Sequence, residues 1–239
     1  MIKHPAAPLN FLVVVVDQLT ACVLPALLGG REPSVVKVPT LEKLAKRGTV
    51  FANAYTASPL CGPARSTFMT GLLPSRSGVY DNGCEWHSDI PTFGHALRLG
   101  GYQTILAGKM HFVGADQLHG FEERLTTDIY PADFTWVPDW TDCTGRPDWY
   151  HSMDSVLNAG PVLRSNQLDF DEEVASTTRR KLYDLARTRT PQHPLCLVAS
   201  STPPHDPFNL TPKSWDLYHP TPIPLPPRAA PTPTTPPPM

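Results

Sequence analysis

Cys61 stands in the most distinctive segment of the sequence, where a thiol is flanked by prolines and followed by a cation. Pro59 and Pro63 lie two residues to either side, Arg65 follows the cysteine by four residues, and Thr67 comes two residues later. A single cysteine can be an ordinary small buried hydrophobe, and this interpretation stays open for Cys61. The combination of rigid, charged and hydroxyl residues is harder to explain by packing alone, so we treat Cys61 as a candidate reactive residue.

Asp17 is a second candidate, because it follows four consecutive valines at the end of an apolar run. A carboxylate at the end of a buried strand could cap the next helix. It could also bind a hard divalent cation, which prefers oxygen ligands. The sequence around Asp17 leaves both interpretations open.

Two histidines, a lysine and an asparagine complete the set of candidates for proton transfer and anion binding. Lys109 and His111 are separated by one residue, so they point to the same face if the chain is extended there. His205 lies in a second segment rich in prolines, and Asn82 lies in an Asp-Asn-Gly turn sequence. An isolated Lys or His is more often solvated at the surface or hydrogen-bonded in the core. These residues therefore indicate a functional site only in combination.

Strands that alternate with helices are expected to position these residues. Apolar runs predict strands at residues 11–16, 50–55, 102–107 and 195–200. Helices are predicted at residues 40–47, 92–99 and 172–188, and another helix is predicted to begin around Arg65. Thr40 is the expected cap of the first helix, and Gly48 is its expected stop.

The alternation predicts an α/β fold with a mostly parallel sheet sandwiched by helices. In such sheets the chemistry lies beyond the carboxyl ends of the strands. Asp17, Lys109, His111 and His205 all follow predicted strands, which favours a shared site.

The composition limits the classes of partner. The chain has 239 residues and a net charge of −2, which argues against a nucleic-acid partner because no basic stripe is present. The apolar run at residues 11–16 is too short for a signal peptide or a membrane span, so we expect no membrane partner. The five cysteines are odd in number and widely spaced, which favours a reducing, cytoplasmic location.

The sequence divides into a domain at residues 1–219 and a tail at residues 220–239. The tail is rich in Pro and Thr and has no apolar period, so we expect it to be disordered. The composition changes abruptly after His219, and we expect the chain to be a truncated version of a longer one.

The segment from Pro59 to Gly78 resembles the active-site signature of the type I sulfatases, within the alkaline-phosphatase-like superfamily. Residues 111–122, followed by 127–131, look most like the choline sulfatases, and the likeness runs from about Asn10 to Phe208. The resemblance implies an incomplete N-terminal domain of the sulfatase fold. It also implies an enzyme that hydrolyses sulfuric esters, with choline sulfate as its substrate.

The resemblance assigns a catalytic role to each residue that matches the family pattern. Cys61 is the residue that a formylglycine-generating maturation enzyme oxidises, and the hydrated aldehyde is the nucleophile. Arg65 binds this diol, Lys109 binds the sulfate, and His111 assists the collapse of the intermediate. His205 is the general acid that protonates the leaving alcohol.

The resemblance also implies a metal and a substrate site. Asp17, Gln18 and the formylglycine from Cys61 are the expected ligands of a divalent cation, which is Ca²⁺ with Mg²⁺ and Mn²⁺ as alternatives. Gln18 stands where many relatives have a second acid. Asn82 is expected to contact the sulfate.

Trp136 and Trp149 are the residues expected to hold the choline group by cation–π attraction, with simple core packing as the alternative. Two other functions also remain open. One is hydrolysis of phosphonate or phosphate monoesters in the same superfamily, and the other is a sulfatase fold without catalysis. A homo-oligomer is compatible with all three.

Overall fold

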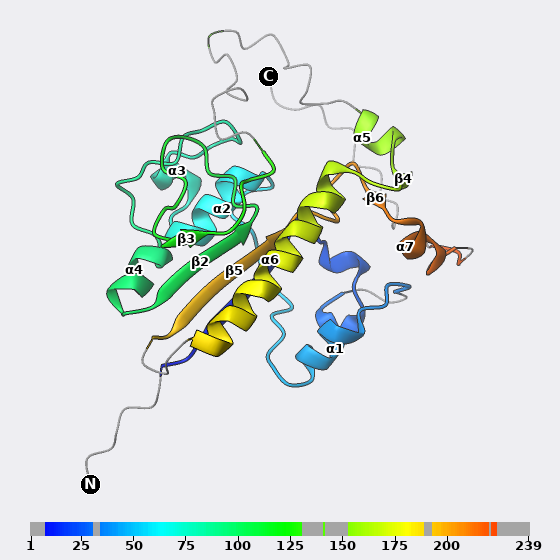
Figure 1. Cartoon of the computed structure of the whole chain (residues 1–239). Helices are drawn as coiled ribbons and strands as arrows, with labels where there is room; N and C mark the ends of the chain where they lie inside the picture. Colours follow the sequence, from blue (N-terminus) through cyan, green and yellow to red (C-terminus); the bar gives the residue numbers. More distant parts are fainter. Residues whose placement is uncertain are drawn as a thin grey trace.

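The computed structural model describes residues 8–30, 34–130, 141, 153–188, 193–219 and 221–223. Within them, a four-stranded sheet forms the centre of the molecule (Figure 1). Its strands lie in the order β1 (Phe11–Val16), β5 (Leu195–Ser201), β2 (Gln103–Gly108) and β3 (Glu123–Arg124). All three pairings are parallel, so the expected parallel sheet is confirmed.

Helices cover the two faces of this sheet. The long helix α6 (Asn166–Thr188) packs on β5 and β2 and runs along them in Figure 1. Leu182 and Leu185 of α6 lie against Ile105 and Leu197 of the sheet. This contact is expected, because a parallel sheet is stable only when apolar side chains on both faces are buried.

Helices α2 (Cys61–Thr70) and α4 (Phe93–Leu99) lie on the opposite face. Met69 of α2 and Leu97 of α4 pack into a core with Leu106, Phe112 and Val198. The α/β sandwich predicted from the sequence is therefore confirmed.

Several details of the predicted elements are wrong. Helix α2 begins at Cys61 rather than around Arg65, and α6 begins at Asn166 rather than at residue 172. Helix α1 (Pro39–Ala45) begins at Pro39 with Val38 as its cap residue, because a proline suits the first helical position, and it ends before Gly48. Thr40 is therefore not the cap. The strand expected at residues 50–55 does not form, and its Phe51 and Tyr55 are exposed; none of the strands in the described residues pairs with this segment.

Short elements complete the described part. They are η1 (Ala21–Val23), η2 (Ala26–Leu28), α3 (Pro74–Ser77), α5 (Asp154–Leu157), α7 (Pro212–Asp216) and a small parallel pair, β4 (Gly160–Pro161) with β6 (Asn209–Leu210). Among all the residues that the structure describes, none of the helices is both long enough and apolar enough to cross a membrane.

Candidate active site

The structure brings Asp17, Cys61, Lys109 and His205 together at one end of the sheet. Asp17 follows β1, Lys109 follows β2 and His205 follows β5, which is the arrangement expected for the carboxyl ends of parallel strands. One ligand atom each of Asp17, Cys61 and His205 lies within 4.8 Å of the others. Residues far apart in the sequence thus form one cluster.

Cys61 is the first residue of α2, and Asn82 fixes this end of the helix. The backbone N–H of Gly62 donates a hydrogen bond of 2.8 Å to Asn82 Oδ1, which satisfies an amide that has no partner within the helix. The backbone carbonyl of Asn82 lies 3.0 Å from Nε2 of His111. Asn82 therefore joins helix α2 to His111.

Gly108 directs the chain from β2 into the site. Its φ is +97°, and a Cβ there would lie 2.0 Å from the carbonyl oxygen of Ser200, so a larger residue would not fit. This turn lets the backbone N–H of Lys109 donate a hydrogen bond of 3.0 Å to the carbonyl oxygen of Ser200. The Lys109 side chain is fully buried; its Nζ contacts Asp17 Oδ2 and lies 3.5 Å from Cys61 Sγ.

Arg65 is buried beside Asp17 and Lys109. It is 6% exposed, and its Nη1 donates to the carbonyl of Lys109 at 2.6 Å and to Ser200 Oγ at 2.9 Å. Its Nη2 lies 3.6 Å from Asp17 Oδ1. Arg65 thus ties α2 to the ends of three strands, a structural role that the sequence did not reveal beside the expected contact with the diol.

His111 has a left-handed backbone, with a φ of +62°, which is costly for a residue with a Cβ. Asp128 holds this conformation, since its Oδ2 accepts hydrogen bonds from the backbone N–H groups of Met110 and His111 at 2.9 and 2.7 Å. Arg124 pairs with the same carboxylate at 3.0 Å. Asp128 was missed as a site residue, although it lies in the segment that resembles choline sulfatases.

Tyr130 is the second residue that the sequence did not single out. Its hydroxyl lies 3.3 Å from His205 Nε2, and its ring centroid lies 4.3 Å from Lys109 Nζ and 5.2 Å from the ring of His111. The cation–π contact with Lys109 is favourable because the ammonium group is desolvated. Tyr130 therefore touches three of the predicted catalytic residues.

The charged groups of the cluster shift the pKa values of Cys61 and Asp17. Burial raises the pKa of the Cys61 thiol, but hydrogen bonds with His111 and His205 and the Lys109 charge outweigh burial and lower the pKa to about 6. Burial also raises the pKa of Asp17, but Lys109 and Arg65 lower it below its usual value. Cys61 is therefore largely a thiolate at neutral pH.

His205 shifts in the opposite direction. Burial lowers its pKa, but hydrogen bonds to Cys61 and to the carbonyl of Asp206 raise it above the usual value for histidine. A raised pKa increases the protonated fraction at neutral pH, which is the form that a general acid requires.

The described residues do not by themselves form a calcium site. Calcium takes six to eight oxygen ligands, whereas the cluster supplies the Asp17 carboxylate, a sulfur and an imidazole, and the Lys109 ammonium already contacts that carboxylate. Gln18 follows Asp17 directly, with a φ of +59° and an exposed side chain. Its role as a ligand stays a prediction.

A cavity of about 440 Å³ opens beside Cys61 and is also lined by Asn82, Tyr130 and His205. Trp136 and Trp149, the residues predicted to bind choline, lie outside the described residues. The cavity has the position required for a small substrate next to the thiol.

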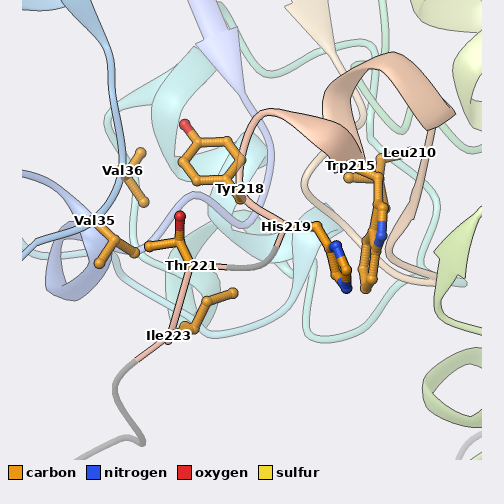
Figure 2. A pocket seen from close by; sticks show the side chains of 8 residues that line it. All are labelled: Val35, Val36, Leu210, Trp215, Tyr218, His219, Thr221 and Ile223. Carbon is orange, nitrogen blue, oxygen red and sulfur yellow. The ribbon is translucent and has the colours of Figure 1, made fainter.

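A more apolar cavity, of about 480 Å³, lies in another part of the molecule (Figure 2). Trp215 and His219 stack with their ring centroids 5.9 Å apart, and the backbone N–H of Lys37 donates a hydrogen bond of 3.1 Å to the Tyr218 hydroxyl oxygen. Predicted site residues are not among those that line it. We therefore do not assign the chemistry to this cavity.

The chain is similar to known proteins over most of its length. The sulfatase family model matches residues 10–219. The choline-sulfatase of Rhizobium meliloti (strain 1021) is 52% identical over 212 residues, which are 87% of this chain and 41% of the relative. The iduronate 2-sulfatase of Mus musculus is 25% identical over 88% of this chain and 37% of its own length.

Solved structures share the fold. The structure of BT4656 in complex with its substrate D-glucosamine-2-N,6-O-disulfate has a TM-score of 0.62 at 21% identity, over 91% of this chain and 39% of that one. The phosphonate monoester hydrolase of Agrobacterium radiobacter has a TM-score of 0.59 at 22% identity, over 86% of this chain and 43% of that one. The chain thus spans less than half the length of each of these proteins.

Proposed function

The chain belongs to the sulfatase family, and we propose that it carries the nucleophile half of a hydrolase that cleaves choline sulfate to choline and sulfate. The observation that carries the proposal is the position of Cys61. It begins α2 at the mouth of a cavity, with Lys109 Nζ 3.5 Å away and His205 in the same cluster. The identity of 52% to a choline-sulfatase supports the choice of substrate.

The proposed nucleophile is a formylglycine made from Cys61. Hydration of its aldehyde gives a carbon with two hydroxyl groups. One hydroxyl would release its proton to solvent water and its oxygen would form a bond to sulfur, while the bond from sulfur to the choline oxygen would break. His205 donates a proton to the departing choline oxygen, and its raised pKa supports this role.

The second step releases the sulfate. The remaining hydroxyl passes its proton to His111, the bond between carbon and the sulfate oxygen breaks, and the aldehyde forms again. Water then restores the diol. Lys109, a buried point charge, offsets the negative charge of the sulfate oxygens during both steps.

A divalent cation is part of the proposal, with Asp17, the formylglycine and Gln18 as its ligands in this chain. Ca²⁺ is the expected ion, with Mg²⁺ and Mn²⁺ as alternatives. The lowered pKa of Asp17 keeps its carboxylate ionised and able to bind a cation. The further oxygen ligands have to come from outside the described residues.

Hydrolysis of a phosphonate monoester is the second candidate, because phosphonate monoester hydrolases are among the structures with the same fold. The two candidates differ in the leaving group and in the charge of the transferred group. A choline leaving group carries a positive charge, for which the proposed contacts are the rings of Trp136 and Trp149.

The test uses the 239-residue chain co-expressed with a formylglycine-generating enzyme and supplied with each of the three cations. Choline sulfate, a neutral aryl sulfate and a phenyl phosphonate monoester are compared as substrates, with Cys61→Ala as the control. The 239-residue chain alone should be nearly inactive, and an in-frame fusion to the part of the Rhizobium meliloti choline-sulfatase outside its aligned region should give turnover of choline sulfate that requires Cys61. Preference of the fusion for the phosphonate would favour the second candidate, and no turnover by a folded, matured fusion would refute the proposed reaction.

A further inference from the structure

Hydrogen bonds fix the walls of the apolar cavity shown in Figure 2. Thr211 caps α7, the helix that carries Trp215, because its hydroxyl oxygen accepts a hydrogen bond of 3.3 Å from a backbone N–H in the first turn. The hydroxyl oxygen of Tyr218 accepts a hydrogen bond from the backbone N–H of Lys37, which ties the segment after α7 to residues 35–37. The cavity is therefore preformed, which lowers the entropic cost of binding.

The lining of this cavity leaves apolar surface open to solvent in the described part of the chain. Trp215 stacks with His219 and is 41% exposed, and Ile223 is 69% exposed. In Figure 2 the stacked rings stand on one side of the cavity, and Ile223 and Val35 stand on the other. Clustered apolar surface of this kind is typical of an interaction site.

The sequence that follows this wall of the cavity is rich in proline. Residues 224–228 read Pro-Leu-Pro-Pro-Arg, and half of residues 224–239 are proline. Such sequences favour the polyproline II helix, which has no internal hydrogen bonds. Segments with the Pro-x-x-Pro spacing of residues 224–227 bind in grooves lined by aromatic side chains, because they lose little conformational entropy. A tail that cannot form a core of its own can become ordered in this way on binding.

We propose that residues 224–228 bind in the cavity of their own chain as a polyproline II helix, with prolines against the ring of Trp215 and with Arg228 beside Asp216. The covalent attachment favours this occupant. Ile223 lines the cavity, so the proline segment begins at its wall and has an effective concentration in the millimolar range. Weak docking, with a dissociation constant of about 0.1 mM, is then enough to fill the cavity.

The charges indicate the direction of the docked segment. Arg228 is the only charged side chain in residues 224–239. Asp216 is exposed at the end of α7, next to Trp215. Five residues of a polyproline II helix span about 15 Å. A segment that starts at Ile223 and crosses the cavity therefore brings Arg228 to the side of α7, where opposite charges attract.

The same segment of a second copy is the competing occupant. At micromolar protein it is present at about a thousandth of the effective concentration of the attached segment. Binding within one chain is therefore favoured, and it does not change with dilution. This docking is independent of the proposed reaction, because the residues that line the cavity are not among the predicted site residues.

The test labels the 239-residue chain with 5-fluorotryptophan and follows the fluorine NMR signal of Trp215, which Trp215→Phe identifies. Replacement of Pro224, Pro226 and Pro227 by Ser should move this signal and increase its shift between H₂O and D₂O, because the ring becomes more exposed. A synthetic peptide of residues 222–239, added to this variant at millimolar concentration, should restore the signal of the parent chain.

The charge pair is tested with the same peptide. Asp216→Lys in the triple serine variant should weaken binding of the peptide by about two- to fivefold, since exposed charge pairs are weak. A peptide with Arg228→Glu should regain that loss on the Asp216→Lys chain. Equal binding of both peptides to both chains would overturn the direction assigned to the segment.

Replacement of Pro236, Pro237 and Pro238 by Ser is the matched control, because it removes as many prolines from outside the proposed segment. It should leave the Trp215 signal unchanged, and circular dichroism checks that every variant folds. A Trp215 signal that is the same in the parent chain and in both triple variants would overturn the proposal, as would a signal that the peptide does not restore. A parent signal that changes on dilution would also overturn it, because the occupant would then be a second copy.

Discussion

Lys109 Nζ lies 3.5 Å from Cys61 Sγ and also contacts Asp17 Oδ2, so one buried ammonium group faces both a thiol and a carboxylate. The contact exists because β2 ends at Gly108, whose left-handed turn aims the following lysine across the ends of the neighbouring strands. A buried lysine is tolerated when its charge is paired, and here Asp17 and the ring of Tyr130 supply that pairing.

The first prediction concerns the reactivity of the unmodified thiol. Because the pKa of Cys61 is lowered to about 6, its alkylation by iodoacetamide should rise as the pH increases through 6 and level off near neutrality. In urea the same rise should move to about pH 8.5, the value for a free cysteine. Lys109→Met removes one of the charges that favour the thiolate, so it should move the rise to higher pH.

Cys84 is the internal control for this experiment, since burial raises its pKa. Its alkylation should stay slow below pH 9, and peptide mass spectrometry separates the two sites. A Cys61 profile that matches the urea profile would contradict the prediction.

The second prediction is that Cys61 is a maturation target. Co-expression with a formylglycine-generating enzyme should convert the Cys61 thiol to an aldehyde, which peptide mass spectrometry detects as a loss of mass at that residue. Cys196, which is buried in β5 and lacks the surrounding motif, should remain a thiol in the same sample. Unmodified Cys61 beside a fully converted control sulfatase would refute the prediction.

The third prediction is that Arg65 is needed for stability. Arg65→Met leaves the carbonyl of Lys109 and Ser200 Oγ without their donor and leaves Asp17 with one cation fewer. Removing one partner of a buried ion pair costs about 3–5 kcal/mol, so the free energy of unfolding in urea should fall by roughly that amount.

Arg164→Met is the matched control, because the Arg164–Asp169 pair is exposed. Exposed pairs contribute about 0–1 kcal/mol, so this variant should unfold at nearly the same urea concentration as the parent chain. Equal losses for the two arginines would mean that the contacts of Arg65 do not stabilise the fold.

The fourth prediction concerns Asp128 as a positioning residue. Asp128→Asn weakens the acceptor for the N–H groups of Met110 and His111 and removes the charge that pairs with Arg124. Unfolding should become easier by about 1–3 kcal/mol. The alkylation profile of Cys61 should also move to higher pH, because His111 would no longer be held beside the thiolate.

Asp184→Asn provides the comparison for Asp128, since it breaks an exposed pair with Arg187 at similar spacing along the chain. It should change neither the stability by more than about 1 kcal/mol nor the Cys61 profile. An unchanged profile in Asp128→Asn would show that Asp128 supports the fold without positioning His111.

The fifth prediction separates the hydroxyl of Tyr130 from its ring. Tyr130→Phe removes the contact with His205 and should cost about 0.5–1.5 kcal/mol in unfolding free energy. Tyr130→Leu also removes the ring that faces Lys109, so it should cost about 0.5–2 kcal/mol more. Equal stability of the Phe and Leu variants would contradict a cation–π contribution.

The sequence by itself predicted β1, β2 and β5, because continuous apolar runs such as residues 11–16 and 195–200 are typical of strands in a parallel sheet. It also singled out Cys61, Asp17, Lys109 and His205 as candidates, since Cys61 stands in the segment that resembles a family signature and the other three follow predicted strands. The structure brings these four residues together. It failed at residues 50–55, where a local β pattern has no partner strand within the described part of the chain.

Only the tertiary structure decided how these residues act on one another. The contacts of Arg65 with Ser200, of Asp128 with the His111 backbone and of Tyr130 with His205 join segments that lie up to 135 positions apart. Likewise, a run of valines predicts burial whichever strand of a parallel sheet contains it. In the structure β1 lies at the end of the described sheet, where α6 does not cover it. Local patterns report which side chains prefer burial, whereas their partners depend on the order in which strands pair and on which helix covers each face.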